Sequence, residues 1–262
     1  MSDDYLIRSI NSENIKNYDI LCLKSKQKTP GYQQKLEWLE QRFTEGLQLK
    51  ILYVNEGKRN LTSRGMIEFI PGRYNWRGIS AEGYMVIHCL WVVGKHKRKG
   101  YGSKLLQECI KASENMFGVA VVTSKRNWLV KNTLFKKHNF EKVDEITPFE
   151  LYVYKTKESH PSPSFNQSDL KVIPIREKGI EIYRSAQCPY TYAMQKYVKK
   201  FGLENNIPVE TIEIKTSEQA QNGYSPYGTF YTTFENNVVT YESIPRVFDQ
   251  YFQQFKNRNS NR

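Results

Sequence analysis

Residues 85–102 read MVIHCLWVVGKHKRKGYG. The first nine residues are almost all apolar and include β-branched and aromatic side chains, a composition typical of a strand buried on both faces. Basic residues and glycines follow, and beyond them apolar residues recur at helical spacing from Leu105 to Met116. The stretch therefore predicts a buried strand over residues 84–93, a loop and then an amphipathic helix.

A strand that passes through a glycine-containing loop into a helix is suited to binding phosphate. The first amides of a helix have no acceptor within the helix, and the helix dipole adds partial positive charge there. Gly100 and Gly102 remove side chains where an anion must approach the backbone. Lys97, Arg98 and Lys99 add positive charge. We therefore expect a phosphate-containing ligand at this loop.

The stretch at residues 92–102 resembles the acetyl-CoA loop of the GNAT superfamily of acyltransferases. The family pattern is abbreviated Arg/Gln-x-x-Gly-x-Gly/Ala, and Lys97 occupies its first position. Gly94 and His96 replace a proline and a tyrosine that precede it in the family. Residues 134–140, LFKKHNF, resemble the family's Leu-Tyr-x-Lys-x-Gly-Phe motif. The resemblance covers roughly residues 5–157.

The resemblance implies an α/β (α+β) GNAT fold with a central splayed mixed sheet, and direct transfer of an acetyl group from acetyl-CoA to an amine acceptor without a metal. The strand end would bind the pantetheine arm through its backbone, and the loop amides would bind the pyrophosphate. The acetyl-CoA-binding residues implied in this way are Leu90, Trp91, Val92, Val93, Lys97, Arg98, Lys99, Gly100, Tyr101, Gly102, Ser103 and Phe135.

The sequence departs from the family at both catalytic positions. Phe135 replaces the tyrosine that serves as the family's acid, and a phenyl ring cannot donate a proton. The family's glutamate base corresponds to Val86, and His88 lies two residues further on the same strand face. With an ordinary pKa of about 6.5, His88 is the candidate base; the other reading is a core histidine satisfied by hydrogen bonds. Glu82, acting through water, is the second candidate.

The sequence leaves two questions open. Because of Phe135, the chain could instead be a catalytically lapsed protein that binds or senses acyl-CoA, with a thiol-binding C-terminal module. Trp76 and Arg77 lie in a turn-rich segment before the central strand, where GNAT loops position the substrate. They are either substrate-binding residues or ordinary loop anchors.

The positive charge of the chain lies in its first part. Residues 1–157 carry 27 Lys and Arg against 16 Asp and Glu, whereas residues 158–262 carry 12 against 11. The tightest basic run, at 95–99, lies in the loop and favours a polyphosphate cofactor, and we expect no nucleic-acid partner. No apolar run reaches the roughly 20 residues of a membrane span, and the four cysteines are far apart. We therefore expect a cytoplasmic protein without membrane contact.

A segment rich in serine and proline at 158–168 indicates a linker, which we place at 158–178 between an acetyltransferase domain at 1–157 and a second domain at 179–262. Further elements of the first domain are predicted from periodicity: strands at 5–10, 49–54, 65–70 and 119–123, a strand-rich segment at 143–154, and helices at 14–23, 33–47 and 129–137. The second domain is predicted to contain strands at 180–183 and 209–214, a hairpin at 228–241 and helices ending near 201 and 255.

The stretch CPYT at 188–191 lies between a strand and a helix of the second domain. This position resembles the active-site turn of thioredoxin-like proteins, and a GNAT domain with such a tail resembles the YoaP-type acetyltransferases. The resemblance implies a smaller thioredoxin-like βαβ-ββα domain. Thr191 replaces the second cysteine, so dithiol exchange is not available. A thiol at a helix start has a lowered pKa, so we expect Cys188 to be the most reactive cysteine, unless the turn is a packed relic.

Overall fold

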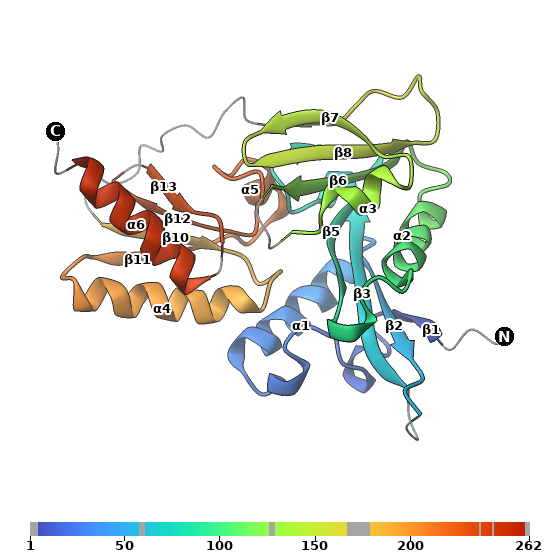
Figure 1. The fold of residues 1–262 in the computed structure, drawn as a ribbon, viewed down its shortest axis with the longest axis horizontal. Coiled ribbons are helices and arrows are strands. Elements are labelled where there is room, and N and C mark those ends of the chain that lie inside the picture. The colour runs from blue at the N-terminus through green and yellow to red at the C-terminus, as the bar shows by residue number, and fades with distance from the viewer. Residues whose placement is uncertain are drawn as a thin grey trace.

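The computed structural model describes residues 5–57, 61–125, 129–166, 179–235, 237–242 and 244–259. A seven-stranded sheet and a four-stranded sheet lie side by side (Figure 1). Residues 167–178 of the expected linker, with Asn236 and Ser243 of the second part, fall outside the described residues. Within residues 158–166, β9 (Ser164–Phe165) pairs with β4 (Ile79–Ser80) in a separate two-stranded sheet.

The first sheet has the strand order β1-β2-β3-β5-β6-β8-β7. Its strands are β1 (Tyr5–Ile10), β2 (Gln48–Val54), β3 (Thr62–Pro71), β5 (Tyr84–Val92), β6 (Gly118–Ser124), β7 (Glu141–Ile146) and β8 (Phe149–Lys155). The pair β5–β6 is parallel, and the other neighbours are antiparallel. The mixed sheet expected for the first domain is therefore confirmed.

Side chains alternate between two cores on the faces of this sheet. Met66 and Ile70 of β3 pack with Trp38 and Leu39 of α1 (Pro30–Phe43). The intervening residues of β3 face the second core, which includes Leu105 and Leu106 of α2 (Tyr101–Ala112) and Phe135 of α3 (Asn132–Lys136). The apolar stripe that predicted α2 is thus the stripe that packs on the sheet.

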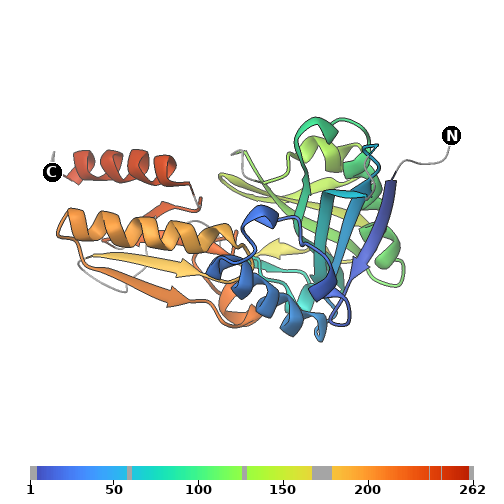
Figure 2. The same ribbon diagram turned by 90° about the horizontal axis from the view of Figure 1, so that it is seen from below.

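The second sheet has the order β11-β10-β12-β13. Its strands are β10 (Ile180–Arg184), β11 (Val209–Glu213), β12 (Phe230–Phe234) and β13 (Asn237–Thr240). Helices α4 (Tyr190–Glu204) and α6 (Pro245–Asn259) cover one face, and α5 (Ser217–Gln221) precedes β12 (Figure 2). Only β10 and β11 are parallel in this sheet. The predicted order of elements is confirmed, with α5 as an addition.

The predicted helix at 14–23 is wrong. The chain forms two 3-10 turns, Ile15–Asn17 and Lys24–Lys26, and Leu21 and Leu23 between them have φ angles of 64° and 51°. These left-handed conformations interrupt any helix. Across the described part of the chain, no helix has the length and apolar content needed to cross a membrane.

Pairing between β5 and β6 stops before either strand ends. The ladder joins Tyr84–Ile87 to Gly118–Val121, but β5 continues to Val92 and β6 to Ser124. The two strand ends therefore diverge, which produces the splay that the sequence resemblance implied. Backbone groups along the diverging edges are available to a ligand.

The two sheets are joined by tight packing. Helix α1 contacts α4, and the guanidinium of Arg184 in β10 donates a hydrogen bond to Gln34 of α1 at 2.7 Å. Gly228, just before β12, has a φ of +70°, and a Cβ at this residue would lie 2.2 Å from the carbonyl oxygen of Trp76. The second sheet therefore approaches the first so closely that the contact requires a glycine.

We predict that Gly228→Ala destabilises the protein more than Gly57→Ala does. Gly57 has the same φ of +70°, but no described atom lies within 4 Å of a Cβ built there. The control should lose about 1 kcal/mol from the left-handed backbone alone. Overlap with Trp76 should cost at least about 2 kcal/mol more for Gly228→Ala, measured by thermal or urea unfolding. Equal losses for the two variants would contradict the close contact between the sheets.

Candidate active site

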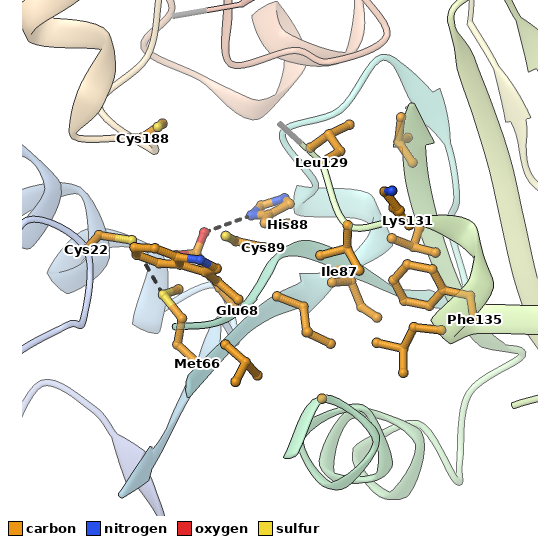
Figure 3. Close-up of a pocket in the computed structure, with 18 of the residues that line it drawn as sticks. Cys22, Met66, Glu68, Ile87, His88, Cys89, Leu129, Lys131, Phe135 and Cys188 are labelled. Carbon is orange, nitrogen blue, oxygen red and sulfur yellow. Dashed lines mark hydrogen bonds and ion pairs between the residues drawn. The ribbon is translucent and has the colours of Figure 1, made fainter. Parts of the chain in front are cut away.

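A single cavity of about 1130 Å³ extends from the loop before α2 into the gap between β5 and β6 and ends between the two sheets. Its walls come from the loop at 96–103, the diverging ends of β5 and β6, the segment 129–137, helix α1 and the turn at 187–190 of the second sheet. Figure 3 shows part of this wall, with His88 and Glu68 on one side and Cys188 facing them from the start of α4.

The loop at the outer end of the cavity has the backbone of an anion-binding site. Gly94, Arg98 and Gly100 have φ angles of 51°, 65° and 79°. Consecutive backbone turns of this kind orient amide groups toward a common point, and the N-terminus of α2 adds its own unpaired amides. The first helical bond, from the Lys104 amide to the Gly100 carbonyl, leaves the preceding amides at the mouth of the cavity.

Glu56, from the connection between β2 and β3, holds this loop in place. Its carboxylate accepts from the Nε2 of His96 at 2.7 Å and pairs with Lys95 at 3.3 Å and with Arg64. Hydrogen bonds from Arg64 and His96 lower the pKa of Glu56 well below its usual range, so it is ionised. The other ring nitrogen of the buried His96, Nδ1, has no hydrogen-bond partner among the described residues, and the side chain lines the cavity.

Most of the residues predicted to bind acetyl-CoA line this cavity. They are Leu90, Trp91, Val92, Lys97, Arg98, Gly100, Gly102, Ser103 and Phe135. Val93, Lys99 and Tyr101 belong to the same loop and strand end but are not among the lining residues. Phe135 is fully buried and packs its ring 5.4 Å from Phe140, so the position of the family's acid carries only an apolar surface here.

A buried ion pair lies at the inner end of the cavity. Glu68 of β3 is 0% exposed, and its Oε2 accepts from the Nζ of Lys35 at 2.5 Å. Its Oε1 accepts from the amide of Gln187 at 2.9 Å, across the interface between the sheets. Burial opposes the charge of Glu68, but Lys35 and His88 outweigh it and lower the pKa of Glu68 to about 2. Glu68 is therefore ionised at neutral pH.

His88 lies beside this ion pair with a fully buried side chain. Its Nε2 accepts the backbone N–H of Trp76 at 2.9 Å, which places the ring proton on Nδ1. Nδ1 faces the Oε1 of Glu68 at 3.4 Å, an electrostatic contact drawn as a dashed line in Figure 3, but it has no hydrogen-bond partner among the described residues. Burial lowers the pKa of His88 to about 4, so the ring is neutral at pH 7. The ring is thus held in place through Nε2 only, and the role of His88 as the base stays a prediction.

The other predicted site residues are dispersed. Glu82 is exposed before the start of β5 and does not line the cavity. Trp76 is buried and packs edge-on against Trp38 at 5.2 Å. Arg77 reaches the cavity, and its guanidinium donates to Tyr227 O at 2.8 Å and to Thr229 Oγ1 at 2.6 Å. Arg77 thus joins the two sheets while it also lines the cavity, and a role in substrate binding stays a prediction.

The expectation of a lowered pKa for Cys188 is wrong. Burial raises the pKa of this thiol, although the amide of Tyr190 at the start of α4 partly offsets the effect. The backbone at the helix start therefore lowers the pKa of the Cys188 thiol as expected, but desolvation raises this pKa by more. Burial also raises the pKa of Cys22, Cys89 and Cys109, with that of Cys89 at about 12. The order of thiol reactivity stays a prediction.

Sequence reasoning missed Glu68, Lys35 and Gln187. Glu68 has a visible signal, because it is the only charged residue within the apolar stretch GMIEFI at 65–70. Lys35 interrupts the buried face of α1 in the same way. Gln187 has no such signal, since its partner is 119 residues away. Within the described residues no cluster of His, Cys, Asp or Glu is arranged to hold a metal ion.

Residues 17–127 match the acetyltransferase (GNAT) family, and the chain belongs to this family of acyltransferases. Among curated proteins it is similar to YoaP of Bacillus subtilis (strain 168), which is described as an uncharacterized N-acetyltransferase. The two are 30% identical over 239 residues, which cover 89% of this chain and 92% of YoaP. The match therefore extends over both sheets.

Solved structures with a similar fold include the N-acetyltransferase PseH of Campylobacter jejuni in complex with acetyl coenzyme A, with 18% identity and a TM-score of 0.43 over 58% of this chain and 100% of PseH. An N-acetyltransferase from Staphylococcus aureus Mu50 gives 16% identity and a TM-score of 0.43 over 59% of this chain and 100% of that protein. The family assignment rests on the sequence matches.

We predict that His88 makes stability depend on pH between about 6.5 and 4. In this window the unfolded chain protonates the imidazole while the folded chain, with the lowered pKa, does not. Stability is therefore fully present above pH 6.5 and is lost as the pH falls toward 4. His88→Gln keeps an acceptor for the Trp76 amide and should reduce this loss by about 1–3 kcal/mol. His138→Gln, outside the cavity, is the control in urea unfolding, and equal slopes for both variants would contradict the prediction.

Proposed function

We propose that this protein is an N-acetyltransferase that binds acetyl-CoA in the cavity and transfers the acetyl group directly to an amine acceptor. One observation carries the proposal: the cavity is continuous from the anion-binding loop, through the gap between β5 and β6, to buried charged groups. Such a path suits a ligand with a pyrophosphate at one end and a reactive thioester at the other.

The residues along this path fit the parts of acetyl-CoA in order. Loop amides, with Lys97 and Arg98, would hold the pyrophosphate. The diverging edge of β5 at Leu90–Val92 would take the polar groups of the pantetheine arm. Phe135 and Leu134 provide an apolar surface along the same channel. The remaining space beyond His88 would receive the acceptor.

The proton of the acceptor amine needs a route. His88 as the base remains a prediction, but its Nε2 already accepts a hydrogen bond, and its pKa of about 4 makes it a weak base. Arg77 and Lys35, both buried at the inner end, further disfavour a proton on His88. We propose that the amine reacts after losing its proton to solvent, without a histidine that titrates near neutral pH.

The domain division is part of the proposal. We assign the acetyltransferase domain to 1–157, the linker to 158–178 and a thioredoxin-like domain to 179–262. The order β11-β10-β12-β13, with a helix between parallel β10 and β11, supports the last assignment. All four cysteines are free thiols, which supports a cytoplasmic location.

We predict that Gly102→Glu abolishes acetyl-CoA binding while Gly102→Ala does not. A Cβ at Gly102 would meet Leu134 at 3.5 Å, an ordinary contact, so alanine is accommodated. Glutamate adds a negative charge beside the anion-binding loop and repels the pyrophosphate. Calorimetry should show heat of binding for the wild type and the alanine variant only. Unchanged affinity in Gly102→Glu, with its thermal unfolding intact, would remove the loop from the site.

A pH–rate profile tests the route of the proton. If the amine loses its proton to solvent, kcat/KM for the acceptor should rise with pH up to the acceptor's own pKa, and His88→Gln should keep the same profile. A rate fall of roughly 100-fold in His88→Ala, with loss of the acidic break in the profile and with acetyl-CoA affinity unchanged, would assign the base to His88.

A further inference from the structure

The inner end of the cavity is built by both sheets. Gln187, Cys188, Pro189, Tyr190 and Tyr227 of the second part line it opposite β3, β5 and α1 of the first. Figure 3 shows Cys188 on the opposite side of this space from His88 and Cys89. The acceptor half of the site is therefore incomplete without the second sheet.

This wall has a fixed position. A Cβ at Gly31, in the first turn of α1, would lie 2.5 Å from the carbonyl oxygen of Pro189. Arg77 is 1% exposed and binds Tyr227 O and Thr229 Oγ1, while its other terminal nitrogen donates to His88 O at 2.5 Å. The turn at 187–190 is thus held against the first sheet from two sides.

A chain of hydrogen bonds crosses the interface at the ion pair. Thr229 Oγ1 donates to Gln187 Oε1 at 2.8 Å, and Gln187 Nε2 donates to Glu68 Oε1 at 2.9 Å. Lys35 binds the other carboxylate oxygen. Gln187 therefore orients Glu68, and the second sheet determines how this carboxylate faces the cavity.

The fixed charges at this end have both signs. Glu68 is an anion, Lys35 and Arg77 are cations, and all three are at most 2% exposed. His88 adds an Nδ1–H that lies 3.4 Å from Glu68 Oε1 and makes no hydrogen bond among the described residues. The other side chains here are uncharged, and four carry sulfur: Cys22, Met66, Cys89 and Cys188. An anion beside several donors complements a ligand that carries an ammonium and a carboxylate close together.

We propose that the acceptor is a free α-amino acid with an uncharged side chain, bound between the two sheets with its amine at Glu68 and its carboxylate facing Lys35 and His88. The inference rests on the acetyltransferase function proposed above. The amine nitrogen forms a bond to the acetyl carbon, the carbon–sulfur bond of acetyl-CoA breaks, and the proton lost by the amine balances the protonation of the CoA thiolate. The products are the N-acetyl amino acid and CoA.

The first test compares amino acids with their carboxamides as acceptors for the full chain. L-Methionine, L-leucine and L-phenylalanine are each paired with the amide, which keeps the amine and the side chain but removes the negative charge. Formation of the N-acetyl product is followed by mass spectrometry. At least one amino acid should give a kcat/KM about 10-fold to 100-fold above its amide, as expected for a lost charge-assisted contact.

The outcomes distinguish a wrong acceptor class from a wrong acetyltransferase function. Acetylation of amides as efficiently as acids, or of polyamines and arylalkylamines but no amino acid, would overturn the acceptor class and leave the acetyltransferase. No acetylation of any amino acid, with acetyl-CoA binding intact by calorimetry, would also overturn it. Absence of acetyl-CoA binding would instead overturn the proposed function.

The second test asks whether the second sheet contributes to acceptor binding. Gln187→Leu keeps the shape of the side chain but removes both hydrogen bonds, so KM for the amino acid should rise about 10-fold or more while KM for acetyl-CoA stays within about twofold. Gln195→Leu is the matched control, because Gln195 of α4 bonds Arg184 and Thr211 and does not line the cavity.

If Gln187→Leu does not fold, as judged by thermal unfolding, Cys188→Phe is the replacement. The larger side chain adds bulk to the wall of the acceptor space and leaves Lys35, Glu68 and Gln187 unsubstituted, so it should raise KM for the amino acid in the same selective way. Equal kinetics of Gln187→Leu and Gln195→Leu, or of Cys188→Phe and the wild type, would show that the acceptor does not bind between the sheets.

Discussion

The end of pairing between β5 and β6 after Ile87 and Val121 is the constraint from which the rest of the site follows. A sheet that closed at this point would have no room for a ligand, and its backbone groups would all be satisfied within the protein. Divergence of the strands opens a channel through the sheet, and it leaves the loop before α2 at one end and α1 at the other. The alternating burial along β3 and β5 gives both faces apolar residues, and on the face toward α1 it also places Glu68 and His88.

The charges along this channel differ in their burial. Lys97 and Arg98 are exposed at the loop, where water and salt screen them and where a phosphate can replace solvent at small cost. Lys35, Glu68 and Arg77 are buried, so their desolvation has already occurred on folding. A buried ion pair adds little net stability compared with apolar residues of the same size. Its value lies in preorganisation, because groups that are already desolvated and oriented act on a substrate without further rearrangement.

Local sequence patterns predicted the parts of this structure that depend on local physics. The strand at 84–93, the loop and α2 were predicted because burial and helical spacing are visible over a few residues. The helix expected at 14–23 failed because Leu21 and Leu23 adopt left-handed conformations that no composition rule indicates. Glu68 and Gln187 are 119 residues apart and Arg77 and Thr229 are 152 apart, so only the folded chain brings them together. The error on Cys188 has the same origin, since the turn at 187–190 packs against α1, which is far away in the sequence.

The second sheet shares its hydrophobic core with the first. One continuous cluster of buried side chains runs from Trp38 and Val86 in the first part to Ile182 and Phe230 in the second. A module tethered by a linker normally meets its neighbour through a smaller and more polar surface, and it moves as a rigid body. Here such a movement would expose this core and break the bonds of Arg77 to the second part. The wall at 187–190 therefore has a fixed place beside the cavity, so the acceptor site that we propose would be set in shape and charge when the chain folds.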